Sequence, residues 1–318
     1  MKNRKTWYWI IGIVVVLLII CGGFVGLGLF IANRFEDGGD GLAFGDAVAI
    51  VRVEGVIVPG EAPPPNPFSG DAGAAYSQQV VENLKQAEEN EDVKSVILYV
   101  DSPGGSVYAS DEIYLQVKAM TKPVVVSMNS LAASGGYYVS APADEIWASP
   151  HTLTCSIGVI FQFINVEGFS EEYGITAVTI TSGKFKDVGN PFREFTEDDE
   201  QLLRAIVDEA YAEFVRIVAE GRHMSEEEVR KIADGRICTG KQAKAANLVD
   251  ELGYFPDVLK RAAELGGIEG EPRTIEYDRA PTLFEALGAN FNRPSPVQEL
   301  QELLHFHSGS PLMYLYVP

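Results

Sequence analysis

Ser134 stands in a run of small residues whose order suits a catalytic nucleophile. The run Asn129–Ala141 reads Asn-Ser-Leu-Ala-Ala-Ser-Gly-Gly-Tyr-Tyr-Val-Ser-Ala and follows an apolar segment, Pro123–Met128, that is typical of a buried strand. A serine that ends a strand and precedes two glycines has little steric cover, and the N–H of Gly135 is free to hold an anion. The alternative interpretation is a tight connection between a strand and a helix in which small residues only save space.

A second glycine turn, Ser102-Pro-Gly-Gly105, follows another apolar segment, Ser95–Val100. Parallel sheets bind ligands at the carboxyl ends of their strands, so two such turns can face one crevice. The N–H groups of Gly105 and Gly135 would then form an oxyanion hole for a tetrahedral intermediate. Taken alone, Ser-Pro-Gly-Gly is also an ordinary turn before a helix.

A serine nucleophile needs a base, and histidine is scarce in this chain. Of the four histidines, only His151 lies among the predicted strands, and no Gly-x-Ser-x-Gly sequence surrounds Ser134, which argues against an α/β-hydrolase. A buried lysine whose pKa is lowered can serve as the base instead. Lys184 and Lys186 follow a predicted strand, although a lysine in a polar loop is usually solvated. The residues alone do not choose between these two lysines.

The segments that must position these residues alternate between strands and helices. Apolar runs predict strands at Ala47–Val58, Ser95–Val100, Val124–Met128, Ile146–Ser149, Ile157–Phe163 and Ala177–Thr181. Helical spacing of apolar residues predicts helices at Ala74–Asn90, Val107–Met120, Glu197–Gly221, Ser225–Ala233, Gly240–Leu248 and Pro256–Leu265. Ser225 and Glu228 suit a capping box at the start of one of them. This alternation predicts an α/β domain with a largely parallel sheet.

The composition limits the partners that the chain can have. Its formal net charge is −20, with 45 acidic and 25 basic residues, so nucleic acid and anionic lipid are unfavourable partners for its soluble part. The three cysteines show no spacing typical of a metal site, and we expect neither a metal nor another cofactor. Cys155 and Cys238 could pair in an oxidising compartment or remain separate buried thiols.

Residues 7–32 contain no charged side chain and form a run long enough to cross a membrane. Basic residues lie in the preceding segment, residues 1–6, so the positive-inside rule predicts a cytoplasmic N-terminus and an extracytoplasmic remainder. A cleaved signal peptide is the weaker alternative, because the apolar run is too long and no Ala-x-Ala site ends it. We therefore expect a single-pass anchor in the cell membrane, followed by a flexible linker at residues 33–46.

Three motifs occur in a fixed order: Ser-Pro-Gly-Gly-Ser, Ala-Ala-Ser-Gly-Gly-Tyr-Tyr and Ser-Gly-Lys-Phe-Lys-Asp. Together with Asp234-Gly-Arg and the segment Thr239–Gly253, they resemble the signal peptide peptidase A family of bacteria in its short single-repeat form. The resemblance begins at about Ala47. It implies the fold of Clp protease and the crotonases, in which β-β-α units repeat along a spiral. It also implies a peptidase domain at residues 47–265 and a C-terminal extension at residues 266–318.

The same resemblance implies roles for single residues. Ser134 corresponds to the nucleophile and Lys186 to the general base, whereas Lys184 falls at a variable position. Ser156 matches the family serine that hydrogen-bonds and orients the lysine amine. In the short form the serine and the lysine are expected from neighbouring protomers, so catalysis would require a homo-oligomer. The expected substrates are released signal peptides and other apolar peptides.

Other interpretations stay open. A protease of the stomatin-partner type would cut a protein partner, a crotonase-type enzyme would act on an acyl-CoA, and an inactive scaffold would bind peptides without cutting them. The apolar segment Pro311–Pro318 resembles a substrate and could occupy a neighbour's binding groove and restrain activity. The simpler alternative is that it packs as an extra strand or at an oligomer interface.

Overall fold

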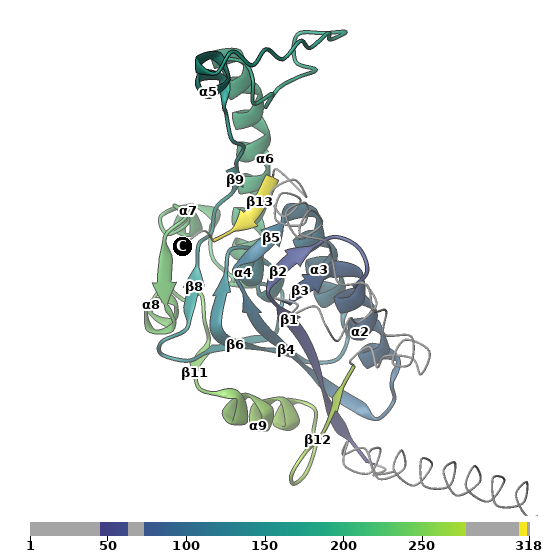
Figure 1. Ribbon diagram of the computed structural model, residues 1–318. Coiled ribbons are helices and arrows are strands. Elements are labelled where there is room, and N and C mark those ends of the chain that lie inside the picture. The colour runs from purple at the N-terminus through teal and green to yellow at the C-terminus, as the bar shows by residue number, and fades with distance from the viewer. Residues whose placement is uncertain (1–44, 63–72, 278–311, 317–318) are drawn as a thin grey trace, which may run out of the picture. The chain divides into compact units, whose positions relative to one another are not determined.

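The computed structural model describes residues 45–62, 73–277 and 312–316, and these contain two β-sheets with helices around them (Figure 1). The strands of the larger sheet are β1 (Ala47–Glu54), β4 (Val93–Ser102), β6 (Val124–Ala133), β7 (Glu145–Ala148), β8 (Leu153–Cys155), β10 (Ile237–Thr239), β11 (Glu251–Leu252) and β12 (Arg273–Glu276). They follow the order β10-β8-β6-β4-β1-β12, with β7 beside β6 and β11 beside β7. Every pairing in this sheet is parallel except that of β8 with β10, as the alternation of elements predicts.

The smaller sheet brings distant parts of the chain together. Its strands are β2 (Val56–Val58), β3 (Ala74–Tyr76), β5 (Gly104–Ser106), β9 (Ile160–Phe161) and β13 (Leu312–Leu315), in the order β3-β2-β5-β13-β9. The C-terminal strand β13 runs antiparallel to both of its neighbours. It is the yellow arrow in Figure 1.

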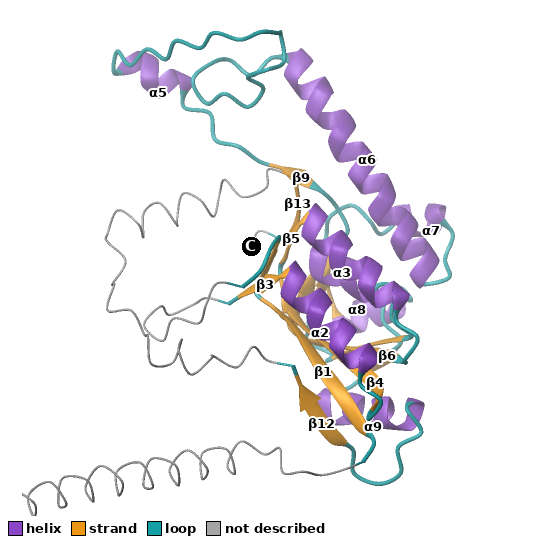
Figure 2. Cartoon of the chain, turned by 90° about the vertical axis from the view of Figure 1, so that its right-hand side faces the viewer, coloured by secondary structure: helices purple, strands orange, loops and turns teal. Residues whose placement is uncertain are grey.

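The helices of the described residues lie around the strands, except for α5, which lies away from them (Figure 2). They are α2 (Ser77–Glu89), α3 (Val107–Ala119), α4 (Gly135–Ser140), α5 (Glu167–Glu172), α6 (Glu197–Gly221), α7 (Glu226–Arg230), α8 (Gly240–Ala245) and α9 (Phe255–Leu265). The predicted capping box of Ser225 and Glu228 is present at the start of α7. Thr196 and Asp199 form a second capping box at the start of α6.

Alternate side chains of β4 enter two different hydrophobic cores. Val96 and Leu98 belong to the large core that also contains buried residues of α2, α3 and α4. Ile97 belongs to a smaller core, where it packs with Val258 and Ala262 of α9. A strand covered on both faces has an almost continuous apolar sequence, which is why Ser95–Val100 was recognisable as a buried strand.

Some predicted element bounds are wrong. Strand β6 continues five residues past Met128 and ends at Ala133, directly before Ser134, because Leu131, Ala132 and Ala133 pair with β8. The predicted strand Ala177–Thr181 is not a strand: Val178 and Ile180 are 83% and 94% exposed. An alternating pattern predicts a strand only when a neighbouring strand can receive it, and the described chain offers none there.

An arm, residues 162–196, extends from the rest of the domain and carries α5 (Figures 1 and 2). Every residue from Glu171 to Lys186 is exposed. The arm nevertheless carries many large apolar side chains that face solvent: Ile164, Phe169, Tyr173, Ile175, Val178, Ile180, Phe185, Phe192 and Phe195. An exposed apolar surface of this kind is typical of an interaction site.

The predicted membrane anchor at residues 7–32 lies outside the described residues, as do residues 33–44 of the predicted linker. Both stay predictions. Among the residues that the structure does describe, no helix combines the length and the apolar character needed to cross a bilayer.

A disulfide bond joins Cys155 of β8 to Cys238 of β10, with the two Cα atoms 5.5 Å apart. Of the two alternatives that the sequence leaves open, the structure therefore shows the paired one. The bond closes a loop between residues 83 positions apart and fixes the edge strand of the larger sheet.

We expect reduction of this disulfide to lower the free energy of unfolding by about 2–4 kcal/mol, because the cross-link restricts the unfolded chain. Urea unfolding of the purified protein with and without dithiothreitol measures the difference. The double variant Cys155→Ser/Cys238→Ser is the control, since its unfolding should not respond to the reductant. Equal midpoints for the oxidised and reduced wild type would contradict the prediction.

Candidate active site

Ser134 lies between the end of β6 and the start of α4, in a strained backbone conformation. Its φ is 53° and its ψ is −114°, a region that residues with a side chain rarely adopt. Such a conformation costs on the order of 1–3 kcal/mol and is found mostly at functional sites. The Ser134 N–H donates to the carbonyl of Cys155 at 2.9 Å, and the Ser134 carbonyl accepts from the N–H of Tyr138 at 2.9 Å. These two bonds hold the turn in place.

The two glycine turns predicted to face one crevice do meet. A Cβ added to Gly135 would lie 3.0 Å from the Cα of Gly104, and one added to Gly104 would lie 2.5 Å from the nitrogen of Gly135. Gly104 also has a φ of 94°, which a residue with a side chain rarely adopts. Space therefore favours glycine at both positions, and at Gly104 the backbone conformation does so as well.

Gly105, the predicted oxyanion donor, lies one residue further along, in β5. It is paired with Ile57 of β2 on one side and with Tyr314 of β13 on the other. A Cβ there would overlap the backbone oxygen of Ile57, so the close approach of β2 also requires glycine. The role of Gly105 and Gly135 as oxyanion donors stays a prediction.

Strand β13 places an extended peptide backbone against both glycine turns. Tyr314 lies opposite Gly105 in the antiparallel pairing. Its carbonyl oxygen lies 3.0 Å from the position of a Cβ on Gly135 and would overlap a Cβ on Gly104. The apolar tail was predicted either to occupy a neighbour's binding groove or to pack as an extra strand. Residues 312–315 of this chain do pack as an extra strand. This strand therefore lies next to the residue that follows Ser134.

The side chain of Tyr314 fills an aromatic pocket. Its ring stacks on Tyr138 with the centroids 4.7 Å apart, and Phe214 of α6 lies at the same centroid distance. The Tyr314 hydroxyl donates to the carbonyl of Ala210 at 2.9 Å. Burial raises the pKa of both tyrosines well above the ordinary value, so the two phenols are neutral. The aromatic pocket is thus occupied by a side chain of the chain's own strand β13.

Ser156, the residue predicted to orient the lysine, is placed next to the nucleophile. Cys155 pairs with Ala133, so the residues that follow them, Ser156 and Ser134, both leave this pair of strands at the same end. Ser156 is buried, and it lines a cavity of about 500 Å³ together with Tyr211 of α6 and Leu315 of β13.

Lys186, the predicted base, is not brought to Ser134 within the chain. It is exposed in a loop of the arm, and Figure 1 shows the arm away from β6 and α4. Its neighbour in the motif, Lys184, forms an ion pair with Asp198 at the start of α6. The arm therefore presents Lys186 to solvent, where a second molecule can reach it.

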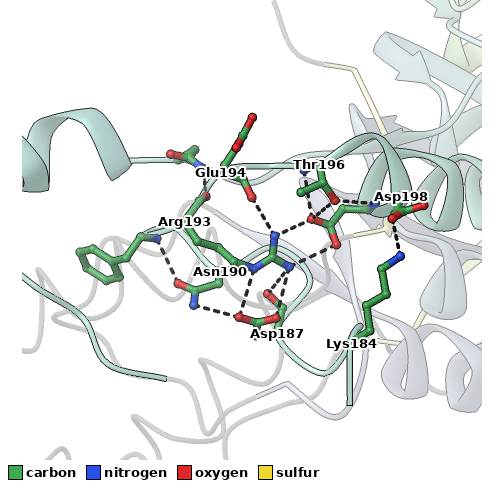
Figure 3. A network of polar contacts seen from close by, with 10 residues as sticks. Lys184, Asp187, Asn190, Arg193, Glu194, Thr196 and Asp198 are labelled. Atoms are coloured by element: carbon green, nitrogen blue, oxygen red, sulfur yellow. Dashed lines mark hydrogen bonds and ion pairs between the residues drawn. The ribbon is translucent and has the colours of Figure 1, made fainter. Parts of the chain in front are cut away.

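Arg193 organises the loop that carries Lys186 (Figure 3). Its guanidinium donates to Asp187, the residue after Lys186, at 3.1 and 3.2 Å, and to Asp199 of α6 at 2.5 and 3.1 Å. Thr196 adds a hydroxyl bond to the Asp199 carboxylate at 2.9 Å. The hydrogen bonds from Arg193 hold the pKa of Asp187 and of Asp199 below their ordinary values. The sequence did not point to Arg193. It lies six positions from Asp187 and six from Asp199, and this spacing predicts a contact only when the course of the loop is known.

Comparisons with known proteins identify the family of this chain. The model of peptidase family S49 matches residues 116–269, and the model of Clp protease matches residues 68–154. A protein of Synechocystis named as a protease is 37% identical over 212 residues, which are 66% of this chain and 76% of that protein. The chain belongs to peptidase family S49. The predicted resemblance to signal peptide peptidase A and the predicted Clp protease-like α/β fold are thereby confirmed.

Two further relatives of this S49 chain match over a smaller share of their own length. A protein of Methanocaldococcus jannaschii named as a protease is 43% identical over 196 residues, 61% of this chain and 63% of the relative. An Enterococcus faecium protein named signal peptide peptidase SppA is 41% identical over 210 residues, 65% of this chain and 61% of the relative. The chain thus spans about three-fifths of the length of these two relatives. Among solved structures, a ClpP1 mutant of Listeria monocytogenes has a TM-score of 0.42 at 18% identity, over 65% of this chain and 92% of that one.

We expect Arg193→Met to loosen the loop that carries Lys186. Hydrogen bonds to charged groups are among the stronger ones, so amide hydrogen exchange at residues 183–190 should become about 10- to 100-fold faster. Arg204→Met is the matched control, because Arg204 forms an exposed ion pair with Glu200 on α6, away from the loop. Equal exchange at residues 183–190 in the two variants would show that Arg193 does not hold the loop.

The same network predicts how the loop responds to pH. The pKa values of Asp187 and Asp199 are lowered in the folded chain, so the contribution of these carboxylates is complete above their ordinary pKa of about 3.9. It is lost as the pH falls through the lowered values. Pepsin should therefore cut the arm faster as the pH falls below about 3.9, where these carboxylates become protonated. Arg193→Met should remove most of this dependence of the cleavage rate on pH.

Proposed function

We propose that this chain is a membrane-anchored serine endopeptidase that cuts apolar peptides with a dyad of Ser134 and Lys186. The observation that carries the proposal is the strained, buried Ser134 between two glycine turns, with a peptide strand lying against both turns. Membership of peptidase family S49 supports the reaction class.

In the proposed reaction the Ser134 hydroxyl attacks the scissile carbonyl carbon while the amine of Lys186 accepts the hydroxyl proton. The carbonyl oxygen becomes an oxyanion, which the N–H groups of Gly105 and Gly135 hold. One such donor typically contributes about 2.7–4 kcal/mol to the transition state. The intermediate collapses, the leaving amine takes the proton from Lys186, and an acyl group remains on Ser134. Water then hydrolyses this ester by the same steps.

The dyad is completed by a neighbouring protomer. A lysine acts as a base when burial disfavours its charge, and the described chain leaves Lys186 exposed on the arm. The apolar surface of the arm supports contact with a second copy, since burial of such a surface favours association. The cavity beside Ser156 supports entry of the neighbour's lysine, and the Ser156 hydroxyl would accept a hydrogen bond that orients the amine.

Apolar peptides are the proposed substrates, with released signal peptides foremost among them. Strand β13 supports this choice because it binds along β5 through its main chain, a mode that tolerates many sequences. The aromatic pocket around Tyr314 supports a preference for a large apolar side chain. The choice of signal peptides in particular rests on the name of the Enterococcus relative, a signal peptide peptidase.

The proposed location is the cell membrane, with the catalytic domain on the extracytoplasmic side. The uncharged run at residues 7–32 and the basic residues before it support a single-pass anchor with a cytoplasmic N-terminus. The disulfide between Cys155 and Cys238 supports an oxidising compartment, since such bonds rarely persist in a reducing cytosol.

We expect Ser134→Ala and Lys186→Ala each to abolish peptide hydrolysis while the protein stays folded. If the dyad is shared between copies, mixing the two inactive variants should recover up to about a quarter of wild-type activity, because some sites receive both native residues. Lys184→Ala is the matched control and should retain activity. Hydrolysis of a fluorogenic apolar peptide, before and after mixing, measures these outcomes.

Full activity in either single variant would overturn the dyad. Two inactive variants that stay inactive after subunit exchange would instead place both residues in one protomer. A serine-directed fluorophosphonate that labels wild type but not Ser134→Ala would exclude an inactive scaffold.

The position of the C-terminal strand β13 predicts that the tail inhibits peptide hydrolysis. Strand β13 lies where a peptide substrate would bind, and a tethered segment competes at an effective concentration of millimolar order. Truncation before Gly309 should therefore raise turnover of a micromolar peptide by about tenfold. Thermal unfolding of the truncated protein checks that the fold survives the loss of the buried Tyr314. An unchanged rate in a folded truncation would show that the strand has only a structural role.

A further inference from the structure

Ser110 of α3 carries a buried hydroxyl group that nothing in the described chain satisfies. The residue is 0% exposed, and its Oγ has no hydrogen-bond partner among the described residues. Other buried serines of this fold are paired: Ser95 donates to the carbonyl of Ala262 at 2.7 Å, and Ser140 to that of Gly136 at 2.7 Å. A buried donor without a partner lowers stability, so its presence needs an explanation.

The Ser110 hydroxyl lies directly against the residue that follows the nucleophile. A Cβ on Gly135 would be 2.7 Å from the Ser110 Oγ and 3.0 Å from the carbonyl oxygen of Tyr314. The hydroxyl and the carbonyl of the chain's own strand β13 therefore approach the same glycine, and β13 marks where the backbone of a substrate peptide would lie. Gly104 borders the same space, since its Cα lies 3.0 Å from that Cβ position.

Ser110 does not form the hydrogen bond that a serine within a helix usually makes. Such a hydroxyl commonly bonds to the carbonyl four residues earlier, which for Ser110 belongs to Ser106. Ser106 is the N-cap of α3, and its side chain accepts from the N–H of Ala109. No bond from Ser110 to Ser106 forms, so the hydroxyl remains available to a group that enters beside Gly135.

We propose that the Ser110 hydroxyl is a further donor to the substrate carbonyl oxygen, acting beside the N–H of Gly135. This inference rests on the proposed peptidase function. When the Ser134 oxygen bonds to the carbonyl carbon, the π electron pair of the carbonyl moves to its oxygen. The Ser110 O–H donates a hydrogen bond to this oxyanion and keeps its proton. When the bond to the leaving amine breaks, the carbonyl reforms and the hydroxyl is again unpaired.

A donor that is unpaired at rest suits catalysis. Only interactions that are stronger in the transition state than in the ground state raise kcat, and a preorganised donor needs no reorientation when charge develops. A hydroxyl already bonded within the fold would have to break that bond first. The absence of a resting partner for Ser110 is therefore a property expected of an oxyanion donor.

The test is Ser110→Ala, which removes the hydroxyl and little volume. We expect the thermal unfolding midpoint to stay unchanged or rise, while kcat for a fluorogenic peptide falls about 10- to 1000-fold with little change in KM. Ser95→Ala is the matched control in another buried helix-to-sheet contact. It should lower the unfolding midpoint and keep the wild-type kcat, because it removes a satisfied bond far from Ser134.

A peptide aldehyde separates a direct contact from a purely structural role. It forms a tetrahedral adduct with Ser134, so Ser110→Ala should weaken aldehyde inhibition by the same factor as kcat/KM and leave inhibition by a product peptide unchanged. Equal weakening of the aldehyde and the product would overturn the inference.

The remaining outcomes separate this inference from the proposed function. Wild-type kcat in Ser110→Ala, or a midpoint lowered as in Ser95→Ala, would overturn the role of Ser110 alone. A wild-type protein that hydrolyses no peptide and is not labelled by the fluorophosphonate would overturn the proposed function, and this inference with it.

Discussion

The close approach of three backbone segments is the constraint on which the rest of the site depends. The turn at Ser134, the glycine turn before α3 and strand β13 meet where a single Cβ on Gly104 would overlap the Tyr314 carbonyl oxygen. Glycine permits this approach, and the carbonyl of Cys155 then fixes the N–H of Ser134. The large core behind these segments holds them together, so the strain at Ser134 is balanced by contacts that the whole domain provides.

Ser134 and Lys186 are held by different kinds of interaction. Apolar packing and parallel strands surround the serine, which is 1% exposed, whereas the lysine lies in a solvated arm ordered by polar contacts. The Arg193 network gives that arm a defined conformation before any partner is bound. Ordering a loop in advance reduces the entropy lost on association, so a base carried on such an arm can enter a partner's site at a smaller cost.

The regular elements could be predicted from the sequence because their causes are local. Helix α6 has the predicted bounds, Glu197–Gly221, since a capping residue and a long apolar stripe mark it within the segment itself. The pairing of β13 with β5 could not be predicted, because it joins residues about 200 positions apart and depends on which edge the larger fold leaves open. The positive φ of Ser134 could not be predicted either, since the hydrogen bond that holds its N–H comes from Cys155 of β8, which is distant in the sequence.

For the site, residue types alone led to Ser134 and Gly135 but not to Lys186. A lysine among polar residues looks solvated, and in the described chain Lys186 is solvated. In the proposed dyad the environment that would make it a base comes from a second molecule, and the periodicity of one sequence carries no information about such a contact. The same arm exposes Val178 and Ile180 almost completely, and exposed apolar side chains do not stabilise a monomer. A second copy that covers the arm would explain two observations at once: the exposed apolar side chains and the exposed candidate base.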